Sequence, residues 1–393
     1  MKKLSKIFII LFIVFAPTIV FAASFDITGK NVILYNLNDD TVLYEQNSNE
    51  KTNIASLTKI MTTLVALENI SDLDETVVIT AEDFSGTDGY SKAGFSIGDE
   101  VTYLDLLYGI ILPSGAEAVN AVVNNTLGYD DFVTEMNNLA QEIGLKNTSF
   151  SNPIGKDNVN NYSTASDIAT ILKFALNNET FKKIFTTKVY TTSNGIDLEC
   201  TLYPYKDILE IDKITGSKSG FTKEAGRCLA SITTLNGVDY LLVVINSTTA
   251  QNYSAVLDTI TIYDYYSDNY SYQTVLTPKD VLATVPVKWS NQKTYNITID
   301  DTVKLYLEND AIDNLEIDYD GVNEIAEFTK KGTKLGTVTI SDGNEILYTA
   351  DITLDADISY YNPIIFAVGI LLVLLIIIIF LKRKKRKRRR KRR

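Results

Sequence analysis

The C-terminal end of the chain restricts its possible folds more than any other segment. Ile364 to Leu381 is an unbroken apolar run, long enough to cross a bilayer as a helix. Tyr360 and Tyr361 precede it, and only basic residues follow, from Lys382 to Arg393. Interfacial tyrosines and a basic flank predict a transmembrane helix at 364–381, a cytoplasmic tail at 382–393 and an extracellular chain before them.

The N-terminal end predicts export. Three lysines precede an apolar run from Ile7 to Ala16, and the small residues Ala22 and Ala23 follow. This order is typical of a signal peptide, here residues 1–23. The alternative is an uncleaved anchor, but the run is shorter than the roughly 18 residues that a span needs.

The charge of the chain differs between compartments. The tail holds 12 of the 37 Lys and Arg residues and the signal peptide holds 3, so 22 basic and 49 acidic residues remain outside, a net charge of −27. Such an acidic surface argues against a nucleic-acid partner. Basic runs can bind nucleic acid, but a run fused to a span is typical of contact with anionic lipid.

The cysteine and histidine content limits the chemistry. Cys200 and Cys228 are the only cysteines, and the chain has no histidine. This composition excludes a disulfide scaffold and argues against a zinc site, so we expect neither a metal nor a cofactor. The two cysteines could pair outside the cell, or one could be a buried thiol and the other incidental.

The extracellular part is long enough for two domains. In the first, predicted at residues 24–272, a hairpin pattern runs from Asn31 to Glu45, and an amphipathic helix begins at Ser56. Two further helices flank a tight turn at Ser114, and two strands flank an Asn-Gly turn at Asn236. β-branched residues then alternate with polar ones, which predicts a small all-β domain at 275–358.

Serine three residues before lysine occurs three times, at Ser48, Ser56 and Ser290. Only Ser56 begins an amphipathic helix, where Lys59 lies one turn later on the same face. For Lys59 to accept a proton near pH 7, burial or a neighbouring cation must lower its pKa by several units. Ser56 is therefore the candidate nucleophile, although the same pattern also fits the polar start of a helix.

Two further motifs accompany this pair. "KSGFT", Lys218 to Thr222, offers a carboxylate a cation, a hydroxyl and close backbone approach if it lies on an edge strand. Ser114 in "PSGAEA" supplies a third serine. The Lys218–Thr222 motif alone would also fit an ordinary turn.

Together and in this order, the three motifs match the penicillin-recognising serine enzymes. From Asp39 to Asp357 the chain resembles the low-molecular-weight penicillin-binding proteins, which are serine D-alanyl-D-alanine carboxypeptidases. The stretches that carry the resemblance are "VLYEQNSNEKTNIASLTKIMT", "GDEVTYLDLLYGIILPSG", "NPIGKDNVNNYSTASDIA" and "KSGFTKEAGRCLAS". The resemblance implies an α/β fold, a β-lactamase/transpeptidase-like antiparallel sheet with helices on both sides, followed by the β-domain and the transmembrane helix.

The resemblance also implies roles for individual residues. Ser56 would form an acyl-enzyme, Lys59 would take its proton, and Ser114 would relay protons toward the leaving amine. Backbone N–H groups of Ser56 and Phe221 would form the oxyanion hole. The implied substrate-binding residues are Lys218, Ser219, Gly220, Phe221 and Thr222, of which Lys218 and Ser219 would hold the terminal carboxylate.

The chain departs from the family pattern at four places. Ala116 stands where the second motif usually has Asn, and Ser219 replaces the commoner Thr. The familiar "NPHG" is "NPIG" at Asn152 to Gly155. Many relatives have an arginine near the position of Asn252, and this chain has none in that stretch.

The implied function is that of a penicillin-sensitive carboxypeptidase that trims peptidoglycan stem peptides. We expect it on the outer side of a bacterial cell membrane, which its chain crosses once. Stem peptides and β-lactams are its expected partners. One alternative is a degenerate wall protein that binds peptide or β-lactam without turnover, because Ala116 has impaired the site. Another is a β-lactamase, which would need an added base to hydrolyse its acyl-enzyme.

Overall fold

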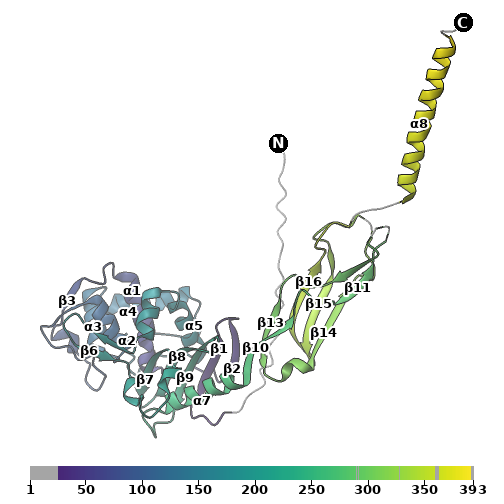
Figure 1. Ribbon diagram of the computed structural model, residues 1–393. Helices are drawn as coiled ribbons and strands as arrows, with labels where there is room; N and C mark the ends of the chain where they lie inside the picture. Colours follow the sequence, from purple (N-terminus) through teal and green to yellow (C-terminus); the bar gives the residue numbers. More distant parts are fainter. Residues whose placement is uncertain (1–24, 289, 291, 327, 359–362, 391–393) are drawn as a thin grey trace. The chain divides into compact units, whose positions relative to one another are not determined.

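The computed structural model describes residues 25–288, 290, 292–326, 328–358 and 363–390. The predicted signal peptide lies outside the described residues. The chain divides between Asn269 and Tyr270 into two compact units, which are described separately (Figure 1). The boundary that we predicted at 272–275 therefore falls inside a strand of the second unit, Tyr270–Leu276.

The first unit is built on a five-stranded antiparallel sheet with the strand order β2-β1-β9-β8-β7. Asn236 and Gly237 connect β8 to β9, and both have a positive φ, as a two-residue hairpin turn requires. The central strands read as nearly continuous apolar runs because both faces of the sheet are covered. The strands are β1 (Asn31–Asn36), β2 (Thr41–Gln46), β7 (Gly216–Thr222), β8 (Gly226–Leu235) and β9 (Val238–Ser247).

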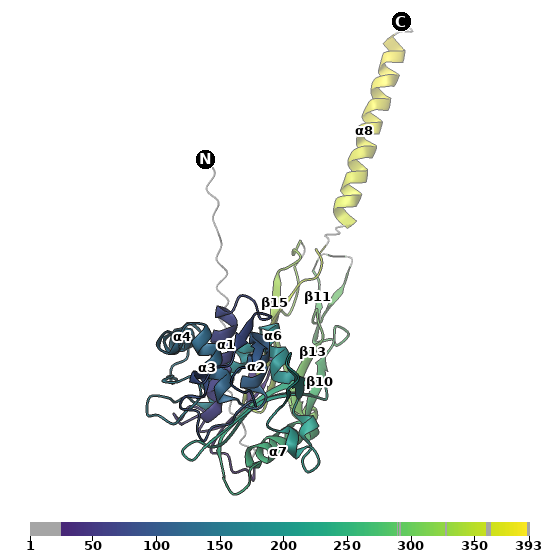
Figure 2. The ribbon, with the colours of Figure 1, turned by 90° about the vertical axis from the view of Figure 1, so that its left-hand side faces the viewer.

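Helices cover both faces of this sheet, as we expected. Helix α7 packs on β8 and β9, and α5 packs on β1, β8 and β9; Figures 1 and 2 show α7 on the side opposite α1 to α6. Helix α1 contacts each of α2 to α6 and is buried from Thr58 to Ala66. The helices are α1 (Thr58–Asn69), α2 (Tyr103–Ile111), α3 (Ala116–Asn125), α4 (Tyr129–Glu142), α5 (Ala165–Ala175), α6 (Glu179–Thr186) and α7 (Ser254–Asn269).

Short elements complete the first unit. Two ribbons pair β3 (Thr76–Val78) with β4 (Glu100–Thr102) and β5 (Val189–Thr191) with β6 (Asp197–Glu199). Single 3-10 turns are η1 (Ala55–Leu57), η2 (Glu82–Phe84), η3 (Tyr203–Tyr205) and η4 (Ile211–Lys213).

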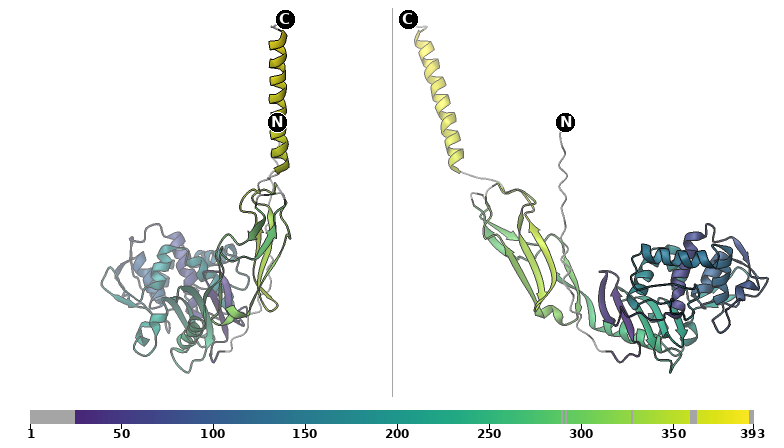
Figure 3. Two further views of the ribbon diagram at one scale, coloured as in Figure 1. Left: turned by 45° about the vertical axis from the view of Figure 1, so that its right-hand side comes forward. Right: turned by 180° about the vertical axis from the view of Figure 1, so that it is seen from behind.

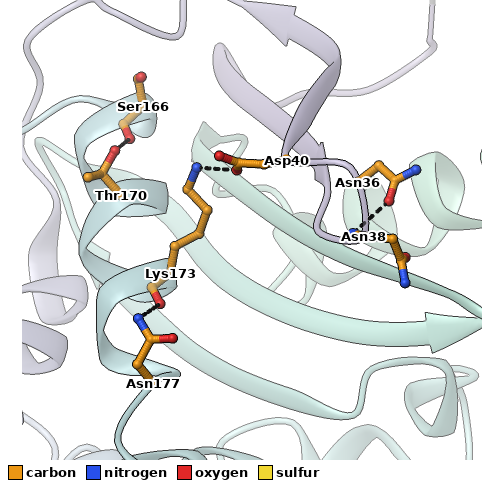
Figure 4. Close-up of polar contacts among 7 residues, drawn as sticks. All are labelled: Asn36, Asn38, Asp40, Ser166, Thr170, Lys173 and Asn177. Atoms are coloured by element: carbon orange, nitrogen blue, oxygen red, sulfur yellow. Dashed lines mark hydrogen bonds and ion pairs between the residues drawn. The ribbon is translucent and has the colours of Figure 1, made fainter. Parts of the chain in front are cut away.

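The turn between β1 and β2 meets the C-terminal half of α5 (Figure 4). Lys173 Nζ lies 2.7 Å from a carboxylate oxygen of Asp40 and 4.2 Å from the centre of the Tyr35 ring. Within the turn, the backbone N–H of Asn38 donates to the side-chain oxygen of Asn36. Because Asp40 is largely exposed, the ion pair contributes at most about 1 kcal/mol, and the buried strands keep the hairpin in place.

The second unit contains an all-β part, in which paired strands run side by side (Figure 3). Apolar side chains such as Ile297, Val338 and Ile340 form its core. Its sequence pattern indicated β11, β12, β13, β15 and β16. We did not single out β14, although Leu315, Ile317 and Tyr319 alternate with acidic residues along it. The paired strands are β10 (Tyr270–Leu276) with β13 (Val303–Glu308), β11 (Ala283–Pro286) with β12 (Thr294–Ile297), and β14 (Leu315–Gly321) with β15 (Lys334–Asp342) and β16 (Glu345–Thr353); η5 covers Ala311–Asn314.

The chain ends in the long helix α8, Pro363–Arg390. In the part of the chain that the structure describes, it is the one helix long and apolar enough to cross a membrane, over Ile364–Lys387. Its apolar side chains are exposed, so they have no protein core to cover them.

Candidate active site

Ser56 lies in the 3-10 turn η1, directly before α1, and not in the first turn of the α-helix itself. Two glycines allow other segments to approach this turn closely. A Cβ on Gly155 would overlap the Ala55 carbonyl oxygen, and a Cβ on Gly220 would lie 2.9 Å from the Ser56 amide nitrogen. The turn is therefore held between the "NPIG" loop and strand β7, with its amide toward the strand.

Lys59 contacts Ser56 directly. Its Nζ donates to Ser56 Oγ at 3.0 Å and to the Ile154 carbonyl at 2.8 Å, and the side chain is 1% exposed. Burial lowers the pKa of Lys59 to about 7, although the Glu117 carboxylate acts in the opposite direction. A lysine with this pKa is about half neutral at pH 7, so it can accept a proton from a neighbouring serine.

The second lysine lies nearby but faces away from solvent. Lys218 is fully buried, and its Nζ donates to the Ser219 carbonyl at 3.0 Å. Burial, followed by the positive charge of Lys59, holds the pKa of Lys218 well below its usual value. Residues 219–222 line the cavity described below, whereas the fully buried Lys218 is not among the residues that line it.

Ser114 occupies the tight turn between α2 and α3 that the sequence predicted. It has a φ of +68° and is 3% exposed. Its Oγ has no hydrogen-bond partner among the described residues, yet it lines the same cavity as Ser56. A buried hydroxyl with no protein partner is available to a ligand or a water molecule.

Ala116 gives the site no polar side chain. It is fully buried, and its backbone N–H donates to the Ser91 carbonyl at 2.8 Å. The next residue, Glu117, is also buried and accepts from the N–H groups of Ala93 (2.5 Å) and Gly94 (3.0 Å). We did not single out Glu117 from the sequence, although an acidic residue in an otherwise apolar helix start was a visible signal.

Ser56, Ser114 and residues 219–222 open onto one cavity of about 710 Å³. Ser219 Oγ and Thr201 Oγ1 share a hydrogen bond of 2.6 Å on its wall. Within the described residues, no group of three or more His, Cys, Asp or Glu could hold a metal ion.

Arg227 is a cavity residue that we missed. Its guanidinium carbon lies 4.0 Å from the centre of the Phe221 ring, and Nη2 donates to the side-chain oxygen of Asn252. The sequence around Asn252 contains no arginine, but strand β8 brings Arg227 next to Asn252 in space. The signal in the sequence was that Arg227 is the only arginine before residue 383.

The two cysteines do not pair. Cys200 and Cys228 are both buried free thiols, and burial raises the pKa of Cys228 to about 12. Of the two possibilities left open by the sequence, the disulfide is the one that the structure lacks.

Comparison with known protein families gives a match for each of the two units. A family described as D-alanyl-D-alanine carboxypeptidase matches residues 18–249, and the penicillin-binding protein 5 C-terminal domain matches residues 270–360. D-alanyl-D-alanine carboxypeptidase DacF of Bacillus subtilis is 27% identical, over 84% of this chain and 85% of its own.

Solved structures agree on the fold. Penicillin-binding protein 5 from Haemophilus influenzae superposes with a TM-score of 0.62 at 22% identity, over 86% of this chain and 99% of its own. The Streptomyces K15 DD-transpeptidase does so with a TM-score of 0.56 at 28% identity, over 62% and 98%. The chain therefore belongs to the D-alanyl-D-alanine carboxypeptidase family of serine peptidases, as a low-molecular-weight penicillin-binding protein.

Proposed function

We propose that this chain removes the terminal D-alanine from peptidoglycan stem peptides through an acyl-enzyme on Ser56, and that β-lactams acylate the same serine. The observation that carries the proposal is the 3.0 Å contact between Ser56 Oγ and a fully buried Lys59. The names of the related carboxypeptidases agree with it.

In the first step, Ser56 Oγ attacks the carbonyl carbon between the two D-alanines, and its proton passes to neutral Lys59. The N–H groups of Ser56 and Phe221 would stabilise the oxyanion, and Gly220 leaves the Ser56 amide uncovered. The C–N bond then breaks as a proton reaches the leaving amine, with Ser114 as the relay. Water finally hydrolyses the ester and releases the shortened peptide.

The substrate carboxylate would lie along β7. Ser219 offers a hydroxyl at the cavity wall, and Gly220, Phe221 and Thr222 continue the wall beside it. Lys218 would support this wall from within the protein, where its fully buried side chain donates to the Ser219 carbonyl.

We also propose that α8 anchors the enzyme in the bacterial cell membrane as a single span, with the catalytic unit outside and the basic tail in the cytoplasm. The exposed apolar face of Ile364–Lys387 and the basic residues after Leu381 support this orientation. The predicted signal peptide would direct export.

The test uses a fluorescent penicillin and a peptide that ends in D-Ala-D-Ala. We expect the wild-type chain to take up the label and to release D-alanine, and Ser56→Ala to do neither. Ser48→Ala is the matched control, because Ser48 also stands three residues before a lysine but lies outside the cavity. Equal loss in both variants would contradict the assignment of Ser56.

Ala116 favours one other function. Without an amide at this position, the chain could bind peptide or β-lactam and turn over neither. Stable labelling without release of D-alanine would support such a binding protein. Rapid loss of the label with release of hydrolysed penicillin would instead indicate a β-lactamase.

A further inference from the structure

The proposed function gives the direction in which a stem peptide lies along β7. Its terminal carboxylate would lie at Ser219, and the carbonyl that reacts would lie between the N–H groups of Ser56 and Phe221. Ser219 precedes Phe221 by two residues, about 7 Å along a strand. The part of the peptide before the two D-alanines therefore continues beyond Phe221, toward the end of β7 at Thr222.

An acidic side chain is held at this end of the strand. Thr222 Oγ1 donates to a carboxylate oxygen of Asp157 at 2.7 Å and accepts from the Ala225 N–H at 3.0 Å. Both Asp157 and Thr222 line the cavity that contains Ser56. The carboxylate of Asp157 thus lies beside the path of the peptide where the peptide passes Thr222.

The loop before Asp157 is closed, although Asp157 itself is exposed. The side-chain oxygen of Asn152 accepts from the N–H groups of Gly155 and Lys156, both at 2.8 Å. The side-chain nitrogen of Asn152 donates to the Lys156 carbonyl at 3.1 Å. The Lys156 ammonium lies 5.8 Å from the centre of the Tyr90 ring. A fixed loop therefore presents the Asp157 carboxylate, and the neighbouring lysine contacts an aromatic ring.

The charge of Asp157 is not neutralised within the part of the chain that the structure describes. Asp157 forms no ion pair there, and neither does Lys223, which lines the same cavity. Burial raises the pKa of Tyr90, and the negative charge of Asp157 raises it further, so this charge acts on the cavity wall. A carboxylate with one hydroxyl partner keeps acceptor positions for a ligand.

We propose that Asp157 binds the side-chain ammonium of the diamino acid that precedes the two D-alanines of the stem peptide. This makes Asp157 a specificity residue. It favours stem peptides whose ammonium is free over those whose amine has become an uncharged amide in a cross-link. The proposal rests on the proposed carboxypeptidase function, which gives the direction of the peptide.

Asp88 is the other acidic residue that lines the cavity. It is exposed and lies in the connection between β3 and β4. We favour Asp157 because Asp157 is hydrogen-bonded to the end of β7, along which the peptide would lie. The experiment therefore includes both acidic residues.

The test compares two peptides that differ only in the charge of one side chain. Nα-acetyl-L-Lys-D-Ala-D-Ala carries a free ammonium, whereas Nα,Nε-diacetyl-L-Lys-D-Ala-D-Ala carries an amide there. Both have the same terminal carboxylate. We expect the wild-type enzyme to show a kcat/KM about two- to fivefold higher for the first peptide, as for an exposed ion pair. This preference should shrink at 1 M salt, because salt screens such a pair.

Asp157→Asn removes the charge but keeps an oxygen that can accept from Thr222. We expect the two peptides to be hydrolysed by this variant with kcat/KM values that agree within about 1.5-fold. Asp157→Glu should retain part of the preference, because it retains the charge. A merely structural role of Asp157 would instead lower kcat/KM for both peptides and leave their ratio unchanged.

Asp197→Asn is the matched control. Asp197 is also exposed and accepts from a threonine hydroxyl, that of Thr191 at 2.6 Å, but it does not line the cavity. This variant lowers the general acidity of the surface by the same charge, and we expect it to keep the preference of the wild type.

Four results would overturn the proposal: equal hydrolysis of the two peptides by the wild type, an unchanged preference in Asp157→Asn, loss of the preference in Asp197→Asn, or its loss only in Asp88→Asn. A wild-type chain that cleaves neither peptide and takes up no penicillin label would refute the proposed function itself, which is a different result.

Discussion

Lys59 must lose its charge to act as a base, and its surroundings favour that loss. The side chain is fully buried, and its Nζ has only the Ser56 hydroxyl and the Ile154 carbonyl as hydrogen-bond partners among the described residues. Glu117 limits the lowering of the Lys59 pKa, because its negative charge favours the protonated lysine. The balance between burial and this carboxylate gives a pKa of about 7.

This pKa predicts the pH dependence of acylation. Below pH 7 the lysine is mostly protonated, so the second-order rate constant for acylation by penicillin should fall about tenfold per pH unit; above pH 7 it should level off. Stopped-flow or quenched labelling between pH 5.5 and 9 measures this, with the thermal unfolding midpoint recorded at each pH as a control. A flat profile between pH 6 and 8 would contradict the role of Lys59.

Ala116 is a departure from the family pattern inside the site, and its effect on the enzyme can be tested directly. Ala116→Asn introduces an amide beside the Ser114 turn, where the side chain is fully buried. We expect lower stability, by about 1–3 kcal/mol, because a larger polar group enters a packed site. If D-alanine release per folded enzyme rises, Ala116 impairs the site; if it falls, the site is adapted to alanine.

At the scale of elements, the site depends on the contact between the η1 turn and the "NPIG" loop. The side-chain oxygen of Asn152 accepts from the N–H groups of Gly155 and Lys156, both at 2.8 Å, which closes the loop. Ile154 then presents its backbone carbonyl to Lys59. A backbone group makes this contact, so it does not depend on the side chain at position 154.

Gly155→Ala should therefore damage both folding and catalysis. Gly155 has a φ of +89°, and its Cβ would overlap the Ala55 carbonyl. We expect a loss of at least about 2 kcal/mol in unfolding free energy and reduced acylation of the remaining folded enzyme.

Gly98→Ala is the matched control for this variant. The φ of Gly98 is +95°, but no atom lies within 4 Å of the added Cβ. The loss of unfolding free energy in Gly98→Ala therefore measures only the cost of a positive φ in alanine, about 1 kcal/mol. Both variants are measured by denaturant unfolding, for stability, and by penicillin labelling, for acylation. Equal effects of the two substitutions would show that the contact with η1 is unimportant.

At the scale of the whole molecule, the apolar surface of α8 predicts firm membrane attachment. A full span is not released by weakening electrostatic contacts, so carbonate and high salt should leave the enzyme in the membrane fraction, and detergent should extract it. A chain that ends at Ile358 should be released and keep its penicillin labelling. Release of the full-length chain by salt alone would contradict the span.

What the sequence determined by itself was local. Period 3.6 after Ser56, alternation in the β-domain, the Asn-Gly hairpin and the C-terminal apolar run each depend on neighbouring residues. They placed Lys59 on a helix and Ser114 in a tight turn, whereas Ser56 lies just before the helix, in the 3-10 turn η1. Only the tertiary structure showed that Lys59 is buried, which lowers its pKa, and that Lys218 does not line the cavity. It also showed that the two cysteines are unpaired and that Arg227 donates a hydrogen bond to Asn252. These features arise from packing between segments that are far apart in the chain. Burial and the β-bulge between Arg227 and Leu229 determine which side chains lie next to each other and how their pKa values shift. The periodicity of neighbouring residues in the sequence contains no information about such contacts.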